Sequence, residues 1–213
     1  AMNQATLGLF IQRQSSWNKE TVIAIDKDHF LHPMSEVARS DVVLVVSEKE
    51  KSQSANKNYA SPKLAKAMST RSDKYSIFNL MELAKALSEP LAAVVNSSDS
   101  FALDDPLRQS IFLCLSEHES DWQITDSGPD IRVNSLKNQK YWNIGVAEFL
   151  GKHQLVDAGV PLKSAIDLEG RLRVTWEYYN AKKTKHPLSL TALQLGHSSL
   201  ETTSAHYDSS AMA

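Results

Sequence analysis

Hydrophobic and polar positions follow two different periods along this chain, and each period predicts its own kind of element. Residues 21–25 and 41–46 are β-branched runs bounded by charged residues, which predicts two strands. Residues 1–20 show no clear period. The run 48–58 is polar and low in complexity, so it predicts a loop.

The next part of the chain predicts helices separated by turns. Ser61 followed by Pro62 is typical of a helix start, so we expect a short helix over 61–68 and a turn over 69–74. Residues 75–78 favour a strand. Leucines and alanines at helical spacing from residue 79 onward predict a helix that ends near Pro90.

Further elements are expected up to the C-terminal region. Asp105 followed by Pro106 predicts a capped helix whose apolar face includes residues 111–115. The sequence also indicates four later features: a break or hinge over 125–130, a helix over 140–150, a turn over 159–161 and a helix over 172–181.

These elements predict an α+β chain that is mainly α. Its 213 residues are enough for one large or two small domains. We expect two units, residues 1–60 and residues 61–213. The first contains strands, and the sequence leaves open whether it belongs to the same domain as the second. A composition of 42% hydrophobic and 23% charged residues is ordinary for a soluble globular protein.

Charge and cysteine content restrict the function classes further. The net charge is −2, yet Lys and Arg outnumber acids by seven to two over residues 49–74 and by six to three over 163–187. Such basic segments fit a DNA-facing side and equally fit solvated helix faces. A single cysteine, Cys114, excludes an internal disulfide and fits a reducing compartment. No apolar run of membrane-spanning length or signal peptide is expected, and we predict a cytoplasmic location.

The most informative stretch lies at residues 190–207 and reads LTALQLGHSSLETTSAHY. An apolar-periodic helix is expected to stop at Gly196, because glycine takes the left-handed conformation that ends helices. His197 then lies at a sharp corner. Ser198 or Ser199 can cap a second short helix that leads to Tyr207. The stretch predicts an imidazole fixed at a turn and a phenol one helix away.

This string resembles the signature of the tyrosine recombinase (phage integrase) family, which carries LGHxS, TT and Y near its C-terminus. Arg173, 24 residues before His197, matches the arginine of the family's His-x-x-Arg motif. The resemblance covers roughly residues 140–207 and is strong from Arg171 onward. It implies that residues 61–213 form a mainly helical catalytic domain with a small antiparallel sheet.

The resemblance also implies a chemistry. Tyr207 would attack a DNA phosphodiester and form a 3′-phosphotyrosine, while Arg173 and His197 would donate hydrogen bonds to the phosphate. Lys74 would be the general acid that protonates the leaving 5′ oxygen. No metal or other cofactor is expected.

The chain departs from the family pattern at three places. Gly170 stands where the motif has histidine, and Tyr207 follows His197 by ten residues rather than nine. The family's first arginine either has one of two candidates or is missing from the chain. Arg71 lies 102 residues before Arg173, in a setting more like the Lys-bearing hairpin, and Arg39 precedes an expected strand.

Several functions therefore remain open. The leading hypothesis is site-specific recombination of double-stranded DNA, in synaptic tetramers, with DNA contacts from Arg171, Lys182, Lys183 and Lys185. A second hypothesis is a DNA-binding module of the same fold with an eroded catalytic site. A third is a helical protein–protein interaction domain that matches the motif by chance.

Overall fold

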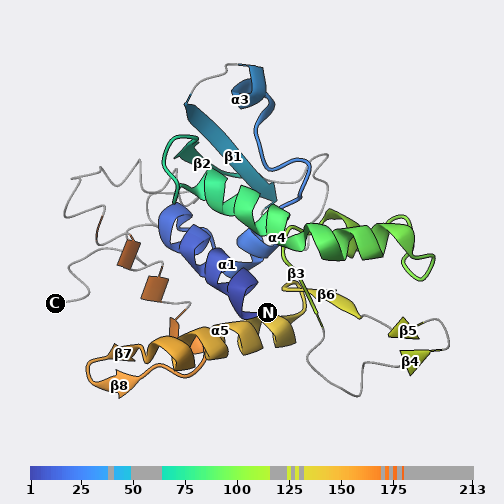
Figure 1. The fold of residues 1–213 in the computed structure, drawn as a ribbon. Coiled ribbons are helices and arrows are strands. Elements are labelled where there is room, and N and C mark those ends of the chain that lie inside the picture. Colours follow the sequence, from blue (N-terminus) through green and yellow to red (C-terminus); the bar gives the residue numbers. More distant parts are fainter. Residues whose placement is uncertain are drawn as a thin grey trace, which may run out of the picture.

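A computed structural model of the chain gives the fold as a set of helices with small antiparallel sheets (Figure 1). The structure describes residues 1–37, 41–48, 64–115, 124–125, 128–129, 132–168, 171–172, 175–176 and 179. Its elements run in the order α1 (Met2–Ser15), α2 (Lys19–Ile23), α3 (Pro33–Val37), β1 (Val42–Glu48), β2 (Leu64–Thr70), α4 (Ile77–Ser97), η2 (Pro106–Gln109), β3 (Leu113–Leu115), β4 (Ile124–Thr125), β5 (Gly128–Pro129), β6 (Val133–Ser135), α5 (Gln139–His153), β7 (Val156–Asp157) and β8 (Val160–Pro161). The expected α+β class is confirmed.

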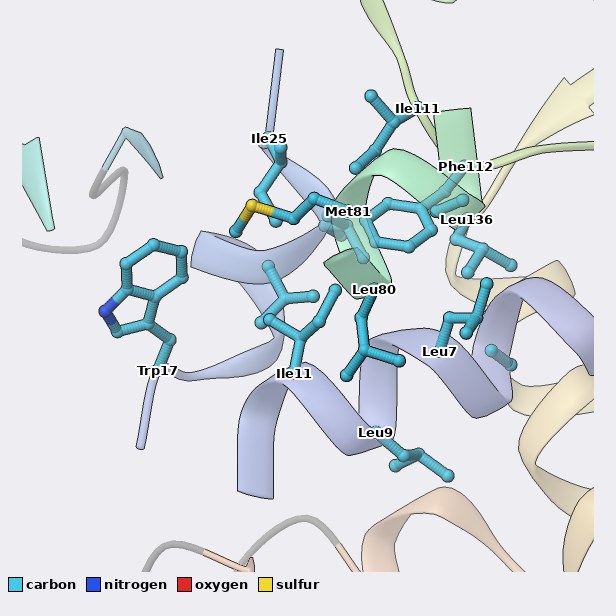
Figure 2. Close-up of a cluster of buried hydrophobic side chains, with 14 of the residues drawn as sticks. Leu7, Leu9, Ile11, Trp17, Ile25, Leu80, Met81, Ile111, Phe112 and Leu136 are labelled. Atoms are coloured by element: carbon cyan, nitrogen blue, oxygen red, sulfur yellow. The ribbon is translucent and has the colours of Figure 1, made fainter. Parts of the chain in front are cut away.

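Helix α1 is the element around which the others pack, and it contacts both α4 and α5 (Figure 1). Leu7, Leu9 and Ile11 are buried in the main hydrophobic cluster, where Leu80 and Met81 of α4 join them (Figure 2). Because α1 is covered on several sides, apolar and small residues are distributed around it. This explains why residues 1–20 show no helical period in the sequence.

Two glycines permit α1 and α5 to approach closely. A Cβ added at Gly145 of α5 would lie 2.7 Å from the Cβ of Ala5, and one added at Gly8 of α1 would lie 2.9 Å from the ring of Trp142. Trp142 itself is fully buried. At these two glycines, the backbone of one helix lies directly against a side chain of the other, and no space remains for a methyl group.

Strands β1 and β2 form an antiparallel hairpin in which Val42 pairs with Thr70 and Glu48 with Leu64. The strand predicted over 41–46 is confirmed. The helix predicted over 61–68 is wrong for its described residues, because 64–68 lie in β2. Pairing with β1, whose Val43 and Val45 are fully buried, overrides the helical preference of the local sequence.

The segment before α3 extends the hairpin at the other edge of β1. The N–H of His32 donates to the carbonyl of Leu44 at 2.9 Å, and the N–H of Val46 donates to the carbonyl of Phe30 at 2.8 Å.

The strand predicted over 21–25 is wrong, since residues 19–23 form α2. The side chain of Asn18 caps that helix by accepting from the N–H of Thr21 at 2.8 Å.

Helix α4 starts earlier and ends later than the sequence predicts. Residues 75–78 are not a strand, because Ser76 caps the helix by accepting from the N–H of Asn79. Pro90 lies inside the helix and does not end it. Beyond Pro90, Ala92 and Val95 pack in a second hydrophobic cluster with β3 and β6, and this packing offsets the hydrogen bond that proline cannot make.

The side chain of Ser88 ties α4 to two other elements. Its hydroxyl donates to the carbonyl of Ile111 at 2.6 Å and accepts from the N–H of Leu113 at 3.0 Å. It also accepts from the side-chain amide of Gln4 in α1 at 2.8 Å. One buried hydroxyl thus fixes the first helix and strand β3 against α4.

The remaining predictions have mixed outcomes. Asp105 caps as expected, accepting from the N–H of Leu107 at 2.8 Å, but only the 3₁₀ helix η2 follows, and residues 113–115 form strand β3. The helix predicted over 140–150 is confirmed as α5. The turn expected at 159–161 is the β7–β8 hairpin, where Ala158 and Gly159 have positive φ of 47° and 80°.

Candidate functional site

The structure describes three of the residues that the sequence assigns to the site: Arg71, Lys74 and Arg171. The others lie outside the described residues, and these are Arg173, His197, Tyr207, Lys182, Lys183, Lys185, and also Arg39 and Gly170. The site can therefore be built from its described part, which is the turn over residues 71–76 between β2 and α4. We call these residues the basic turn.

Asp41, just before β1, holds the start of the basic turn. Its backbone carbonyl accepts from the N–H of Arg71 at 2.9 Å. Its carboxylate accepts from the N–H of Ser72 at 2.8 Å and from the hydroxyl of the same serine at 2.9 Å. The turn is thus fixed to the opposite strand of the hairpin by both main chain and side chain.

Asn79, in the first turn of α4, holds the basic turn from the other side. Its side-chain amide donates to the carbonyl of Arg71 at 2.8 Å and to the carbonyl of Asp73 at 2.7 Å. The hydroxyl of Ser76 donates to the carbonyl of Thr70 at 2.6 Å. These bonds satisfy carbonyls that neither β2 nor α4 can pair, so they define the backbone of an exposed turn.

The basic turn presents two exposed cations. The guanidinium of Arg71 lies over the ring of Phe78, 4.8 Å from its centroid, and the ammonium of Lys74 lies 5.5 Å from the ring centroid of Tyr75. Contacts of this kind orient a cation without neutralising it. Within the described part of the chain, neither cation forms an ion pair with a carboxylate. Both charges are therefore available to an anion.

Arg171, in contrast to Arg71 and Lys74, is already paired with a carboxylate. Its guanidinium forms an ion pair with the carboxylate of Asp157 in β7, and its Nε donates to the carbonyl of Asp167 at 2.7 Å. The side chain is about half exposed (53%). An anion that binds Arg171 must compete with a carboxylate already present.

The side chain of Asp167 bonds back to the N–H groups at the start of the helical residues 165–168. Its carboxylate accepts from the N–H groups of Lys163 at 3.1 Å and Ser164 at 3.0 Å. The backbone N–H of Lys163 and the hydroxyl and N–H of Ser164 hold the pKa of this carboxyl below its ordinary value of 3.8. The residues that follow, where described, are helical: 171, 172, 175, 176 and 179.

A cavity of about 380 Å³ lies at the opposite end of α1 from the basic turn. Gln4, Leu87, Cys114 and Glu148 are among its lining residues. Helix α1 has 14 residues, so its two ends are separated by roughly 20 Å. The cavity is therefore a separate feature from the basic turn.

No group of three or more His, Cys, Asp or Glu among the described residues could hold a metal ion. None of the helices within the described ranges is long and apolar enough to cross a membrane.

Sequence reasoning missed the residues that shape the basic turn, Asp41 and Asn79. Their signal was available, because Asp and Asn next to a predicted turn commonly bond to its backbone. The partner of each, however, depends on the pairing of β1 with β2. Searches for related proteins give no help with the site: no family model matches the chain, and no curated protein matches its sequence.

Proposed function

We propose that this chain is a tyrosine-type site-specific recombinase, which cleaves and rejoins double-stranded DNA through a covalent bond to Tyr207. The observation that carries the proposal is the string LGHSSLETTSAHY at residues 195–207, preceded by Arg173 at 24 residues before His197. Its residue types are those that phosphoryl transfer to a phenol requires. We also propose that the α+β fold is that of the recombinase catalytic domain.

In the proposed reaction, the phenol of Tyr207 loses its proton to water and its oxygen forms a bond to phosphorus, while the bond from phosphorus to the 5′ oxygen breaks. The leaving 5′ oxygen takes a proton from Lys74. Arg173 and His197 donate hydrogen bonds to the non-bridging oxygens, where negative charge develops. Rejoining reverses these steps, with a 5′ hydroxyl as the attacking group.

The basic turn supports this assignment for Lys74 and Arg71. The two residues flank a short exposed turn whose backbone is bonded to Asp41 and Asn79. A general acid must stand within hydrogen-bond reach of the leaving oxygen, and a fixed backbone limits how far a flexible lysine can stray from it. Arg71 would add a second cation beside the same phosphate.

A second candidate function is a DNA-binding module with an eroded site. Gly170 favours it, because glycine stands where the family motif has a histidine that handles protons. On this hypothesis the chain binds DNA and forms no covalent bond to it.

The test is trapping on a nicked DNA substrate from which the short fragment that carries the free 5′ hydroxyl escapes after cleavage, so that rejoining is blocked. The DNA would come from the ends of the element that encodes the protein. We expect a DNA-linked band on a denaturing gel from the wild type and from a matched control, Tyr179→Phe. Tyr207→Phe is expected to lose the band, since phenylalanine has no nucleophile.

The other outcomes separate the two functions. DNA binding in a shift assay with no band from the wild type would favour the eroded module. A band that persists in Tyr207→Phe would reject Tyr207 as the nucleophile. Absence of both a band and salt-dependent DNA binding would overturn the DNA proposal altogether.

A further inference from the structure

Gln14, in the last turn of α1, contacts two segments that are far apart in the sequence. Its side-chain amide donates to the backbone carbonyl of Tyr75 at 2.7 Å. Its own backbone carbonyl accepts from the indole N–H of Trp176 at 3.1 Å. One residue therefore joins the basic turn to the helical stretch that includes Trp176.

The position of Gln14 is fixed by the core beneath it. Ile11, one turn earlier on α1, is fully buried. The hydroxyl of Ser15 donates to the carbonyl of Ile11 at 2.7 Å, and Ser16 ends the helix in a left-handed conformation at φ 60°. Because this end of α1 is held on both its main chain and its side chains, Gln14 is a firm point of attachment.

The bond from Gln14 reaches the basic turn close to Lys74. Asp41 and Asn79 hold residues 71–73, whereas Gln14 holds the carbonyl of Tyr75, the residue after Lys74. The Lys74 ammonium also lies over the ring of Tyr75, 5.5 Å from the ring centroid. The backbone on both sides of Lys74 is thus anchored, on one side to the hairpin and α4 and on the other to α1.

The second contact of Gln14 involves the segment of the motif arginine. Trp176 lies three residues after Arg173 in the sequence, and its indole is partly buried. A residue that bonds to Tyr75 and to Trp176 fixes the basic turn relative to that indole. Reactions of this kind depend on the placement of groups to within about 1 Å.

We propose that Gln14 is a positioning residue that holds Lys74 for its role as general acid. This inference rests on the proposed function, and it extends that function to a residue outside the motif. The bond is between neutral groups and is exposed, so its loss is expected to slow DNA cleavage by no more than about fivefold.

The test compares two substitutions of similar size. Gln14→Met removes the donor while leaving the side chain uncharged and of similar length. Gln14→His retains a donor at a similar reach and is expected to restore cleavage. Thermal melts of both variants check that each is folded, and amide hydrogen exchange of residues 71–76 is expected to increase in Gln14→Met alone.

A substrate with sulfur at the leaving position distinguishes the mispositioning of Lys74 from a general loss of activity. When sulfur replaces the leaving 5′ oxygen, the thiolate leaves without a proton, because thiols have a pKa of roughly 8.5. On ordinary DNA, Lys74→Ala is expected to slow adduct formation by about 10² or more, and Gln14→Met by up to about fivefold. On the sulfur substrate both defects are expected to disappear.

The outcomes distinguish this inference from the proposed function. If the wild type forms an adduct and Gln14→Met is slowed equally on both substrates, or is not slowed on either, Gln14 does not position the general acid. If the wild type forms no adduct on either substrate, the proposed function fails, and the inference fails with it.

Discussion

Asp167 illustrates how one side chain can determine the local response to pH. Its carboxylate accepts two backbone N–H groups at the start of a helix, and its pKa lies below 3.8. A pKa that is lower in the folded state adds to the free energy of unfolding at every pH at which the carboxylate is ionised in the unfolded chain. That stability is present above about pH 3.8 and is lost as the pH falls through the lower folded-state pKa.

We therefore expect Asp167→Asn to melt at a lower temperature than the wild type near neutral pH, with the difference vanishing in acid below the ordinary pKa of 3.8. Melting curves measured across the acid range check this. Asp99→Asn, at an exposed position in the turn after α4, is the control and should melt like the wild type throughout. A difference that persists in acid would show that the cap does not act through its charge.

At the residue scale, the sequence indicates the chemistry of the basic turn but not its support. Arg71 and Lys74 are candidates only through the resemblance to the tyrosine recombinase family. Asn79 is of a residue type typical of turn borders, but neither its bonding partner nor that of Gln14 can be read from the sequence, since each side chain bonds to a backbone carbonyl that the folded structure brings near. Side chains that bond to distant main chain are the ones that a linear pattern cannot reveal.

The close packing of α1 on α5 is an interaction of whole elements that depends on the missing side chains of Gly8 and Gly145. We expect Gly145→Ala to lower the free energy of unfolding by about 1–3 kcal/mol, because the new Cβ would lie 2.7 Å from Ala5 and 2.9 Å from the carbonyl of Ala1. Urea unfolding measures the change.

Gly151 provides a matched control on the same helix. No atom lies within 4 Å of a Cβ added there, so Gly151→Ala should raise the free energy of unfolding by about 0.5–1 kcal/mol through the reduced entropy of the unfolded chain. Equal effects of the two substitutions would mean that helical preference dominates and that α1 and α5 do not pack at this distance.

The strand over 42–46 and the helix over 140–150 are predicted correctly. Residues 21–25 carry the same signal as 41–46, a β-branched run between charged residues, but five such residues fit a buried helical turn as well as a strand. The helix predicted over 64–68 is wrong for another reason. The alanines and lysine of this segment favour a helix locally, but pairing with β1 makes the segment a strand.

At the scale of the whole molecule, DNA binding should depend on basic segments rather than on the net charge of −2. Replacing Lys182, Lys183 and Lys185 together by glutamine is expected to reduce the slope of log Kd against log salt by about 2–3, roughly one for each phosphate that a lysine no longer neutralises. Fluorescence anisotropy at several salt concentrations measures the slope.

The control removes the same charge from another element. Lys137, Lys140 and Lys152 are exposed residues at or near the ends of α5, and their replacement by glutamine should leave the slope unchanged. An equal reduction in both triple variants would indicate that the chain binds DNA through overall charge and has no dedicated face.

The contacts of α1 also have a consequence for how the protein is made. This helix leaves the ribosome before the elements it packs against, since Ser88, Tyr75 and Trp142 all come later in the chain. The part of its apolar surface that packs on α5 must stay uncovered until α5 has been synthesised. The nascent chain thus completes its core late, through contacts between distant residues, and exposes apolar surface that favours aggregation during that interval.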